Sequence, residues 1–227
     1  MGEAEFCHSI ARFSIPLDLS KVPAIDKFVG RTEDLESLWN ILQPSASDIR
    51  KVVVLHGLGG IGKTQLAIQF ARLHQNDFSA IFWLDGRTKE ALLFSLADLL
   101  NKLPGINMTM DLKTEEEIES AAKQVLQWLA APNNCKWLLI FDNIDKYSAT
   151  EQLIDECYDV TKFFPSADHG SIIITTRVHQ LAEVGESYPL KILQSDEAVT
   201  LLIQSAGLAT KVSDHLSPIL PGKSQSS

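Results

Sequence analysis

The sequence has no apolar run long enough to cross a membrane, few cysteines and no excess of positive charge over its 227 residues. A transmembrane helix needs about 20 consecutive apolar residues, and no run here approaches that length. The acidic N-terminus MGEAEFCHSI lacks the apolar centre of a secretory signal peptide. Phe6 stands where an N-myristoylation motif requires Ser or Thr. We therefore expect a cytoplasmic protein without a membrane partner.

Charge and cysteine usage exclude two further classes. The net charge is −9 and the pI is about 5.1, whereas a general nucleic-acid binder needs a basic surface to neutralise phosphates. The three cysteines, Cys7, Cys135 and Cys157, have neither the spacing of a metal site nor that of a disulfide framework. We interpret them as reduced, buried hydrophobic residues of a cytosolic protein.

Short apolar runs alternate with helical patterns through the middle of the chain. The runs have the length and branching of strands, and continuous apolar strands that alternate with helices are typical of a parallel sheet covered on both faces. The predicted strands are residues 52–56, 80–84, 137–141, 171–175 and 189–193. One predicted helix begins at Thr32, and three more cover residues 63–73, 89–103 and 114–130. The last of these begins with a capping box of Thr114 and Glu117.

The two ends of the chain lack this periodicity. Residues 1–25 include Pro16 and Pro23 and are interpreted as a leader or linker. Residues 207–227 end in the polar stretch LPGKSQSS and are predicted to be disordered. The sequence thus predicts one α/β domain over residues 26–206.

The stretch GLGGIGKT, residues 57–64, fits the phosphate-binding pattern G-x-x-x-x-G-K-[ST] between a predicted strand and a predicted helix. The glycines allow backbone N–H groups to approach phosphate oxygens, and the helix N-terminus adds its positive dipole end. Lys63 is expected to reach the β- and γ-phosphates, and the Thr64 hydroxyl to bind Mg²⁺. The other predicted binding residues of this loop are Gly57, Gly59, Gly60, Ile61, Gly62 and Gln65.

Two further strand ends carry charged residues. Asp142 follows the apolar run WLLIF and is the predicted second magnesium ligand. The earlier strand–acid junction, Leu84-Asp85, lies close behind the phosphate loop and is followed by Gly86, so we interpret it as a turn. Arg177 follows the run SIIITT. Ligands of open α/β sheets lie at the carboxyl ends of strands, so Arg177 is predicted to bind the γ-phosphate.

Three function classes share such a phosphate loop. A kinase would carry an arginine-rich lid, but residues 104–136 contain only Lys113, Lys123 and Lys136 as basic residues. The N-K-x-D guanine motif of GTPases and the LSGGQ signature of transporter ATPases are absent. A vestigial loop in an interaction protein would not be expected to keep Lys63, Thr64, Asp142 and Arg177. We favour a nucleotide-dependent switch; the alternatives are a vestigial P-loop interaction module and a turnover P-loop enzyme such as a kinase.

The order of the motifs resembles the NB-ARC class of signal-transducing ATPases with numerous domains, which are NLR-like proteins. The resemblance covers about residues 25–206. The stretches FWLDGRT, LLIFDN and FPSADHGSIIITTR are most similar to the sequences of fungal members of this class. The matching stretches are FVGRTE at residues 28–33, the phosphate loop, FWLD at 82–85, LLIFD at 138–142, GSIIITTR at 170–177, and the strand and helix of 188–202.

This resemblance implies a fold, a ligand and a mode of action. It implies a P-loop NTPase three-layer sandwich with strand order 2-3-4-1-5. It implies adenine near Val29, with Arg31 close to the base or ribose. It also implies an ADP-bound resting state that exchanges for ATP in the presence of Mg²⁺, hydrolyses ATP slowly, and oligomerises to drive an effector in innate-immunity-type signalling.

The sequence departs from the family pattern in two places. The family usually has a second acid after the magnesium aspartate, thought to help polarise the attacking water, and Asn143 occupies that position. An amide cannot take a proton near neutral pH, and whether Asp145 replaces the acid is left open. The expected catalytic set is therefore Lys63, Asp142, Asn143 and Arg177. The adenine clamp Gly-x-Pro and the late histidine of the family have no convincing match, so we expect a nucleotide-binding domain without its regulatory domains.

Overall fold

The computed structural model describes residues 13–20, 22, 28–44, 49–105, 113–149 and 157–206 of the 227-residue chain. The predicted disordered tail, residues 207–227, and residues 1–12 of the predicted leader lie outside the described residues. None of the described helices is both long and apolar enough to cross a membrane.

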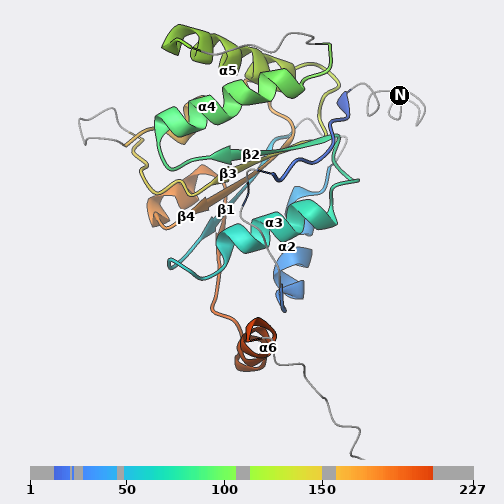
Figure 1. The fold of residues 1–227 in the computed structure, drawn as a ribbon, viewed down its shortest axis with the longest axis vertical. Coiled ribbons are helices and arrows are strands. Elements are labelled where there is room, and N and C mark those ends of the chain that lie inside the picture. The colour runs from blue at the N-terminus through green and yellow to red at the C-terminus, as the bar shows by residue number, and fades with distance from the viewer. Residues whose placement is uncertain are drawn as a thin grey trace, which may run out of the picture.

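Five parallel strands form a single sheet in the order β2-β3-β4-β1-β5 (Figure 1). This is the order that the family resemblance implies, and it confirms the predicted α/β class. Because all strands run in the same direction, their carboxyl ends, which carry the predicted site residues, meet at one edge of the sheet. The strands are β1 (Lys51–His56), β2 (Ala80–Asp85), β3 (Trp137–Asp142), β4 (Ser171–Thr176) and β5 (Glu186–Pro189).

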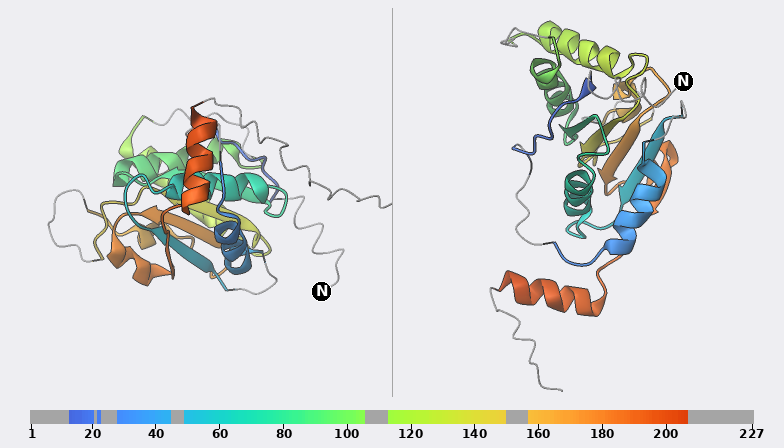
Figure 2. Two further views of the ribbon diagram at one scale, coloured as in Figure 1. Left: turned by 90° about the horizontal axis from the view of Figure 1, so that it is seen from below. Right: turned by 90° about the vertical axis from the view of Figure 1, so that its right-hand side faces the viewer.

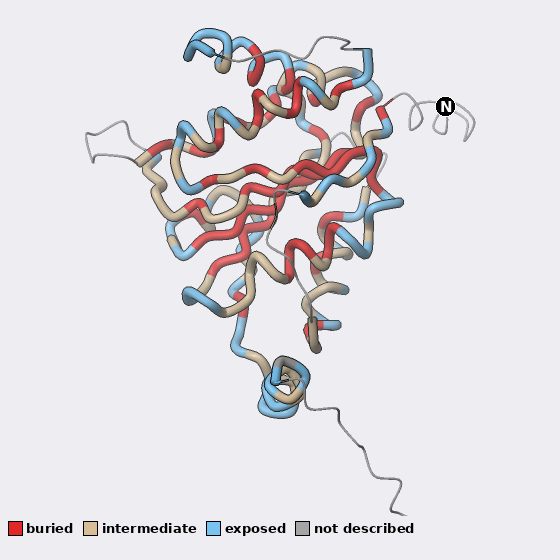
Figure 3. Tube along the Cα trace, in the orientation of Figure 1, coloured by how far each residue is buried: buried red, intermediate tan, exposed pale blue. Residues whose placement is uncertain are grey.

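Helices cover both faces of the sheet (Figures 1 and 2). The helices α4 (Lys89–Leu99) and α5 (Glu115–Leu129) lie on one face, and α2 (Thr32–Leu42) and α3 (Lys63–Leu73) lie on the other. Successive side chains of a strand point to opposite faces. Accordingly, Phe141 packs in the cluster under α4 and α5, whereas Ile140 packs in the cluster under α2 and α3. The strands β1 to β4 are therefore largely buried (Figure 3).

The predicted helix starts agree with the structure. The helix α2 begins at Thr32, and the capping box of α5 is formed, because Glu117 N donates to Thr114 Oγ1 at 3.2 Å and Thr114 N donates to Glu117 Oε2 at 3.0 Å. The predicted helix over residues 89–103 is too long, since α4 ends at Leu99 and tightens into a 3₁₀ turn. The 3₁₀ segments are η1 (Leu100–Lys102), η2 (Val160–Phe163) and η3 (His179–Val184).

The prediction of a strand over residues 189–193 is wrong in its position. The edge strand β5 lies earlier, at Glu186–Pro189, and pairs with β1 alone. An edge strand has a neighbour on one side only. The side chains of β5 are largely exposed, so its sequence need not be apolar. Leu190 N still donates to His56 O at 2.9 Å, after which the chain leaves the sheet and Ile192 is exposed.

The last described helix, α6 (Ser195–Ser205), lies apart from the sheet (Figures 1 and 2). Its contact with the rest of the domain includes Glu197, whose Oε1 accepts a hydrogen bond from Arg31 N at 3.1 Å. Gly30 makes this approach possible, because a Cβ at that position would lie 2.0 Å from Glu197 Oε1. The side chains of Val199 and Leu202 are exposed on α6.

The described part of the predicted leader lies along the edge strand β2. Ile15 N donates to Ser79 O at 2.8 Å, and the Phe13 ring contacts the edge of Trp128 with centroids 5.6 Å apart. Residues 13–20 therefore pack on the domain.

Candidate nucleotide-binding site

The phosphate loop connects β1 to the N-terminus of α3. Gly57, Gly60 and Gly62 have φ values of 145°, 77° and 101°, which residues with a Cβ rarely adopt. Gly62 is the N-terminal cap of α3, and the first backbone N–H groups of a helix have no partner within it. The loop and helix start together form a cradle that can bind an anion.

Lys63 is held inside this loop by backbone oxygens. Its Nζ donates to Gly57 O and to Leu58 O, both at 2.9 Å. Burial, and to a lesser degree the charge of Arg177, lowers the pKa of Lys63, while the carboxylates of Asp145 and Asp142 act in the opposite direction. The ammonium group thus lies within the loop, and its contact with phosphates stays a prediction.

Asp142 is joined to the phosphate loop through Thr64. Its Oδ1 accepts hydrogen bonds from Thr64 Oγ1 at 2.8 Å and from Thr175 Oγ1 at 2.6 Å. Burial raises the pKa of Asp142, the two hydroxyl donors lower it, and the charges of Asp85 and Asp145 raise it. A half-buried carboxylate whose charge is disfavoured, beside a hydroxyl, is a suitable environment for a hard cation.

The donor set fits Mg²⁺ that is shared with a phosphate ligand. Mg²⁺ is usually held by one or two protein oxygens together with phosphates and waters, and Thr64 and Asp142 supply two such oxygens in contact. Among the described residues, no group of three or more His, Cys, Asp or Glu side chains could hold a metal ion by itself. The site therefore does not fit a metal bound by protein ligands alone.

Asn143 follows Asp142 in the left-handed backbone conformation, with φ of 69°. Asparagine and aspartate tolerate this conformation better than other residues with a Cβ. Asn143 N donates to Thr175 Oγ1 at 2.9 Å, so one threonine hydroxyl orients both Asp142 and the residue after it.

Arg177 lies against the phosphate loop but is paired with Asp145. A Cβ added at Gly59 would be 3.6 Å from Arg177 Cδ. Arg177 N donates to Asp145 Oδ1 at 2.8 Å, and Arg177 Nε donates to Asp145 Oδ2 at 2.6 Å. The Arg177 side chain is 61% exposed. The structure therefore places Arg177 beside the cradle, with Asp145 bound to its guanidinium.

Arg31 contacts the loop from the other side. Its NH2 donates to Ile61 O at 2.9 Å, its NH1 donates to Asp34 Oδ2 at 3.1 Å, and the residue is 8% exposed. Arg31 thus links the phosphate loop to α2 and, through its backbone N–H and Glu197, to α6. Val29 is half-buried two residues earlier. Adenine binding by Val29 and Arg31 stays a prediction.

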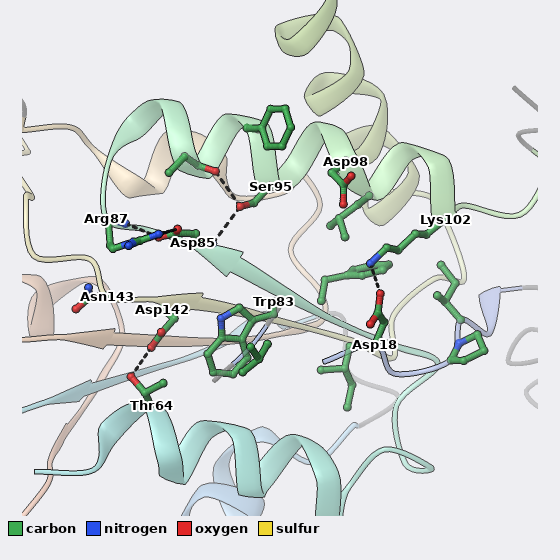
Figure 4. Close-up of a pocket in the computed structure, with 18 residues that line it drawn as sticks. Asp18, Thr64, Trp83, Asp85, Arg87, Ser95, Asp98, Lys102, Asp142 and Asn143 are labelled. Carbon is green, nitrogen blue, oxygen red and sulfur yellow. Dashed lines mark hydrogen bonds and ion pairs between the residues drawn. The ribbon is translucent and has the colours of Figure 1, made fainter. Parts of the chain in front are cut away.

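A cleft of about 700 Å³ extends from the Asp142 end of the site between β2, α3 and α4 (Figure 4). Thr64, Asp142 and Asn143 line one end of it. At the other end, Asp18 pairs with Lys102 at 2.7 Å.

Our sequence analysis did not identify Thr175 and interpreted Asp85 as part of a turn. The signal for Thr175 was the hydroxyl at the end of an otherwise apolar run. The signal for Asp85 was its place at the carboxyl end of a predicted parallel strand, since such ends meet at one edge of the sheet.

The family comparison agrees with this geometry. The model of the NB-ARC domain matches residues 31–212. A nucleotide-binding leucine-rich repeat (NLR)-like protein of Hyaloscypha variabilis is 28% identical over 187 residues, which are 77% of this chain and 18% of that protein. The disease resistance protein RPS5 of Arabidopsis thaliana is 25% identical over 213 residues, which are 90% of this chain and 22% of that protein. The chain thus spans about a fifth of the length of these relatives.

Solved structures support the P-loop NTPase fold. Cdc6p from Pyrobaculum aerophilum has a TM-score of 0.54 at 14% identity, covering 86% of this chain and 54% of that one. The ORC2 protein of Aeropyrum pernix has a TM-score of 0.50 at 17% identity, covering 83% of this chain and 55% of that one. At these identities the likeness concerns the fold alone. The matched residues, the strand order and the phosphate loop joined to Asp142 lead to one conclusion: the chain belongs to the NB-ARC domain family.

Proposed function

We propose that this chain is the ATP- and ADP-binding switch module of an NLR-like signalling protein, with an ADP-bound resting state, Mg²⁺-dependent ATP binding and slow hydrolysis. The observation that carries the proposal is the Thr64–Asp142 hydrogen bond beside a loop that already holds the Lys63 ammonium. The names of the relatives, an NLR-like protein and a disease resistance protein, support a signalling role.

Phosphate binding would replace neutral partners of Lys63 with charged ones. The ammonium now donates to two backbone carbonyls. Hydrogen bonds between ionised groups are roughly twice as strong as those between neutral groups, so phosphate oxygens at the α3 N-terminus compete well for Lys63. Magnesium, when bound to Thr64 and Asp142, would neutralise phosphate charge, and Thr175 would keep the Asp142 carboxylate oriented toward it.

Arg177 offers a way to distinguish ATP from ADP. Its present partner is Asp145, in an ion pair whose arginine is mostly exposed. An exposed ion pair contributes little because solvent screens it, whereas a charge-assisted hydrogen bond to a phosphate is among the stronger kinds of hydrogen bond. Exchange of Asp145 for a γ-phosphate is therefore favourable, and ADP cannot induce it. Asp145 would then be released from Arg177 with ATP bound and paired with it with ADP bound, which would distinguish the two nucleotide states.

Slow turnover follows from the residues beside Asp142. Asn143, which stands where the family usually has a second acid, cannot act as a base. A missing positioned base costs about 10²–10⁴-fold in rate. We expect turnover below roughly 0.1 s⁻¹, against typical enzyme values of about 1–10³ s⁻¹.

The nucleotide that remains bound through purification tests this proposal. Denaturation followed by chromatography should release ADP at a ratio near one per chain. Lys63→Ala should abolish nucleotide binding without changing the circular dichroism spectrum. Lys51→Ala is the matched control, since Lys51 lies at the opposite end of β1 and donates to Gln43 O. ATP binding by Lys63→Ala within about threefold of the parent, or steady-state turnover above about 1 s⁻¹, would contradict the proposal.

A further inference from the structure

A second carboxylate lies next to Asp142 on the neighbouring strand. Asp85 is the last residue of β2 and pairs in parallel register with Asp142, the last residue of β3. Both residues line the cleft together with Thr64 and Asn143 (Figure 4). Because they are register partners on adjacent strands, their side chains lie on the same face of the sheet. Asn143 has no carboxylate, and the carboxylate of Asp145 is paired with Arg177.

The backbone around Asp85 is fixed by three hydrogen bonds. Asp85 N donates to Ser95 Oγ at 3.2 Å, Gly86 N donates to Asp142 O at 2.7 Å, and Tyr158 OH donates to Gly86 O at 2.6 Å. The chain passes so close to β3 that a Cβ at Gly86 would lie 2.9 Å from Asp142 O. The glycine after Asp85 therefore allows the ends of β2 and β3 to come together, and it does not form a separate surface turn.

Arg87 keeps the Asp85 carboxylate ionised and oriented. Its Nε donates to Asp85 Oδ1 at 2.9 Å, and its NH2 pairs with Oδ2 at 2.5 Å. These hydrogen bonds hold the pKa of Asp85 below its usual value. The Arg87 side chain is 69% exposed, so its guanidinium can withdraw into solvent when a ligand enters the cleft. Asp85 is thus an anionic acceptor at neutral pH beside the expected magnesium ligand.

We propose that Asp85 orients the attacking water in ATP hydrolysis by accepting a hydrogen bond from it, without taking its proton as a general base would, so that turnover stays slow. This inference rests on the proposed nucleotide-binding function. The carboxylate accepts a hydrogen bond from the water, whose oxygen forms the new bond to the γ-phosphorus. The bond from the γ-phosphorus to the bridging oxygen breaks with its electron pair remaining on ADP, and a proton is released to solvent.

The test is Asp85→Asn, which keeps the size of the side chain and removes its charge. Three quantities are measured on the full chain: the single-turnover rate of ATP hydrolysis with Mg²⁺, the Kd values for ATP and ADP, and the ATP-to-ADP ratio of the nucleotide carried through purification. We expect hydrolysis to slow by about 100-fold or more, with both Kd values within about threefold of the parent and bound ATP replacing ADP. The matched control is Asp98→Asn, which removes a carboxylate toward the Lys102 end of the same cleft (Figure 4) and should behave as the parent.

Two further variants separate orientation of water from structural support. Asn143→Asp in the Asp85→Asn background places a carboxylate beside Asp142 again and should recover at least about tenfold of the lost rate. Asp85→Glu keeps the charge opposite Arg87 but displaces it by one methylene, and should also slow hydrolysis without changing Kd. This variant decides the question if Asp85→Asn does not fold.

The outcomes distinguish this inference from the function on which it rests. A parent chain that binds no adenine nucleotide would refute the proposed function itself. Intact binding combined with an unchanged rate in Asp85→Asn and Asp85→Glu would refute the role of Asp85 alone. A loss of ATP affinity beyond about tenfold in both variants would make Asp85 a binding residue and would equally overturn the role proposed here.

Discussion

Replacing Thr175 with valine tests whether one buried hydroxyl supports the magnesium end of the site. Thr175 Oγ1 donates to Asp142 Oδ1 at 2.6 Å and accepts from Asn143 N at 2.9 Å. The residue is 1% exposed. Valine has nearly the same shape as threonine, so the substitution removes two hydrogen bonds while the surrounding side chains keep their packing.

The size of the effect follows from these two bonds. A hydrogen bond to an ionised carboxylate contributes about 1.5–3 kcal/mol, and an N–H left without a partner costs about 1–3 kcal/mol. Asn143 is only half-buried, so water reaches its N–H and the lower value applies. The added methyl group recovers about 0.8 kcal/mol. The net loss in the free energy of unfolding is about 2–3 kcal/mol, which lowers the Tm of a domain of this size by about 4–12 °C.

The assay is urea unfolding followed by tryptophan fluorescence, in EDTA and without nucleotide so that ligand binding does not contribute. Thr175→Ser is the matched control, because it keeps the hydroxyl and loses a single methyl group, at a cost of about 1 kcal/mol. Thr175→Val should be less stable than Thr175→Ser. If Thr175→Val proves at least as stable as the parent, the two hydrogen bonds contribute nothing to stability and Thr175 does not support this end of the site.

Three more expectations concern other parts of the domain. Arg177→Ala should weaken ATP binding about five- to seventyfold in calorimetry, since the lost phosphate contact exceeds the exposed pair with Asp145; an equal loss for ADP would contradict a γ-phosphate role. Burial, with the charges of His179 and Lys63, lowers the pKa of His56. The unfolded chain therefore binds the proton more tightly, and stability should fall as pH drops below about 6.5; the same slope in His56→Gln would exclude His56 as its source. Gly170→Ala should cost about 2–5 kcal/mol in urea unfolding, because φ is 83° and a Cβ would lie 2.3 Å from the buried Trp137 ring. Gly105→Ala, with φ of 85° and an open surrounding, should cost only about 1–2 kcal/mol, and equal losses would show that the ring contact is unimportant.

The central strands and the phosphate loop could be predicted from the sequence because both rest on local patterns. A run such as WLLIFD is apolar on both faces only if helices cover both faces, and the structure places Trp137–Asp142 in that position. The glycines, Lys63 and Thr64 lie within one short segment, so their spacing alone fixes their arrangement. The strand order came from the family resemblance, since no local pattern specifies which strands are neighbours.

The remaining errors arise where backbone pairing or distant contacts decide the structure. The edge strand Glu186–Pro189 is polar and mostly exposed, so it has no apolar period, whereas the more apolar residues after it were predicted as the strand. The pairing of Arg177 with Asp145 joins two strand ends that the sequence separates. The proximity of Asp85 to Asp142 depends on the register of β2 against β3, which cannot be read from either strand alone.

The attachment of α6 has a mechanical consequence. Force applied along α6 reaches the domain through the short segment after β5 and through Glu197, which is hydrogen-bonded to Arg31 N. Arg31 in turn holds the Ile61 carbonyl of the phosphate loop. One route from this helix to the phosphate loop therefore consists of two hydrogen bonds in series. In a longer chain, rotation of a domain connected after α6 would pull on the phosphate loop through these contacts. A phosphate bound in the loop would oppose that rotation.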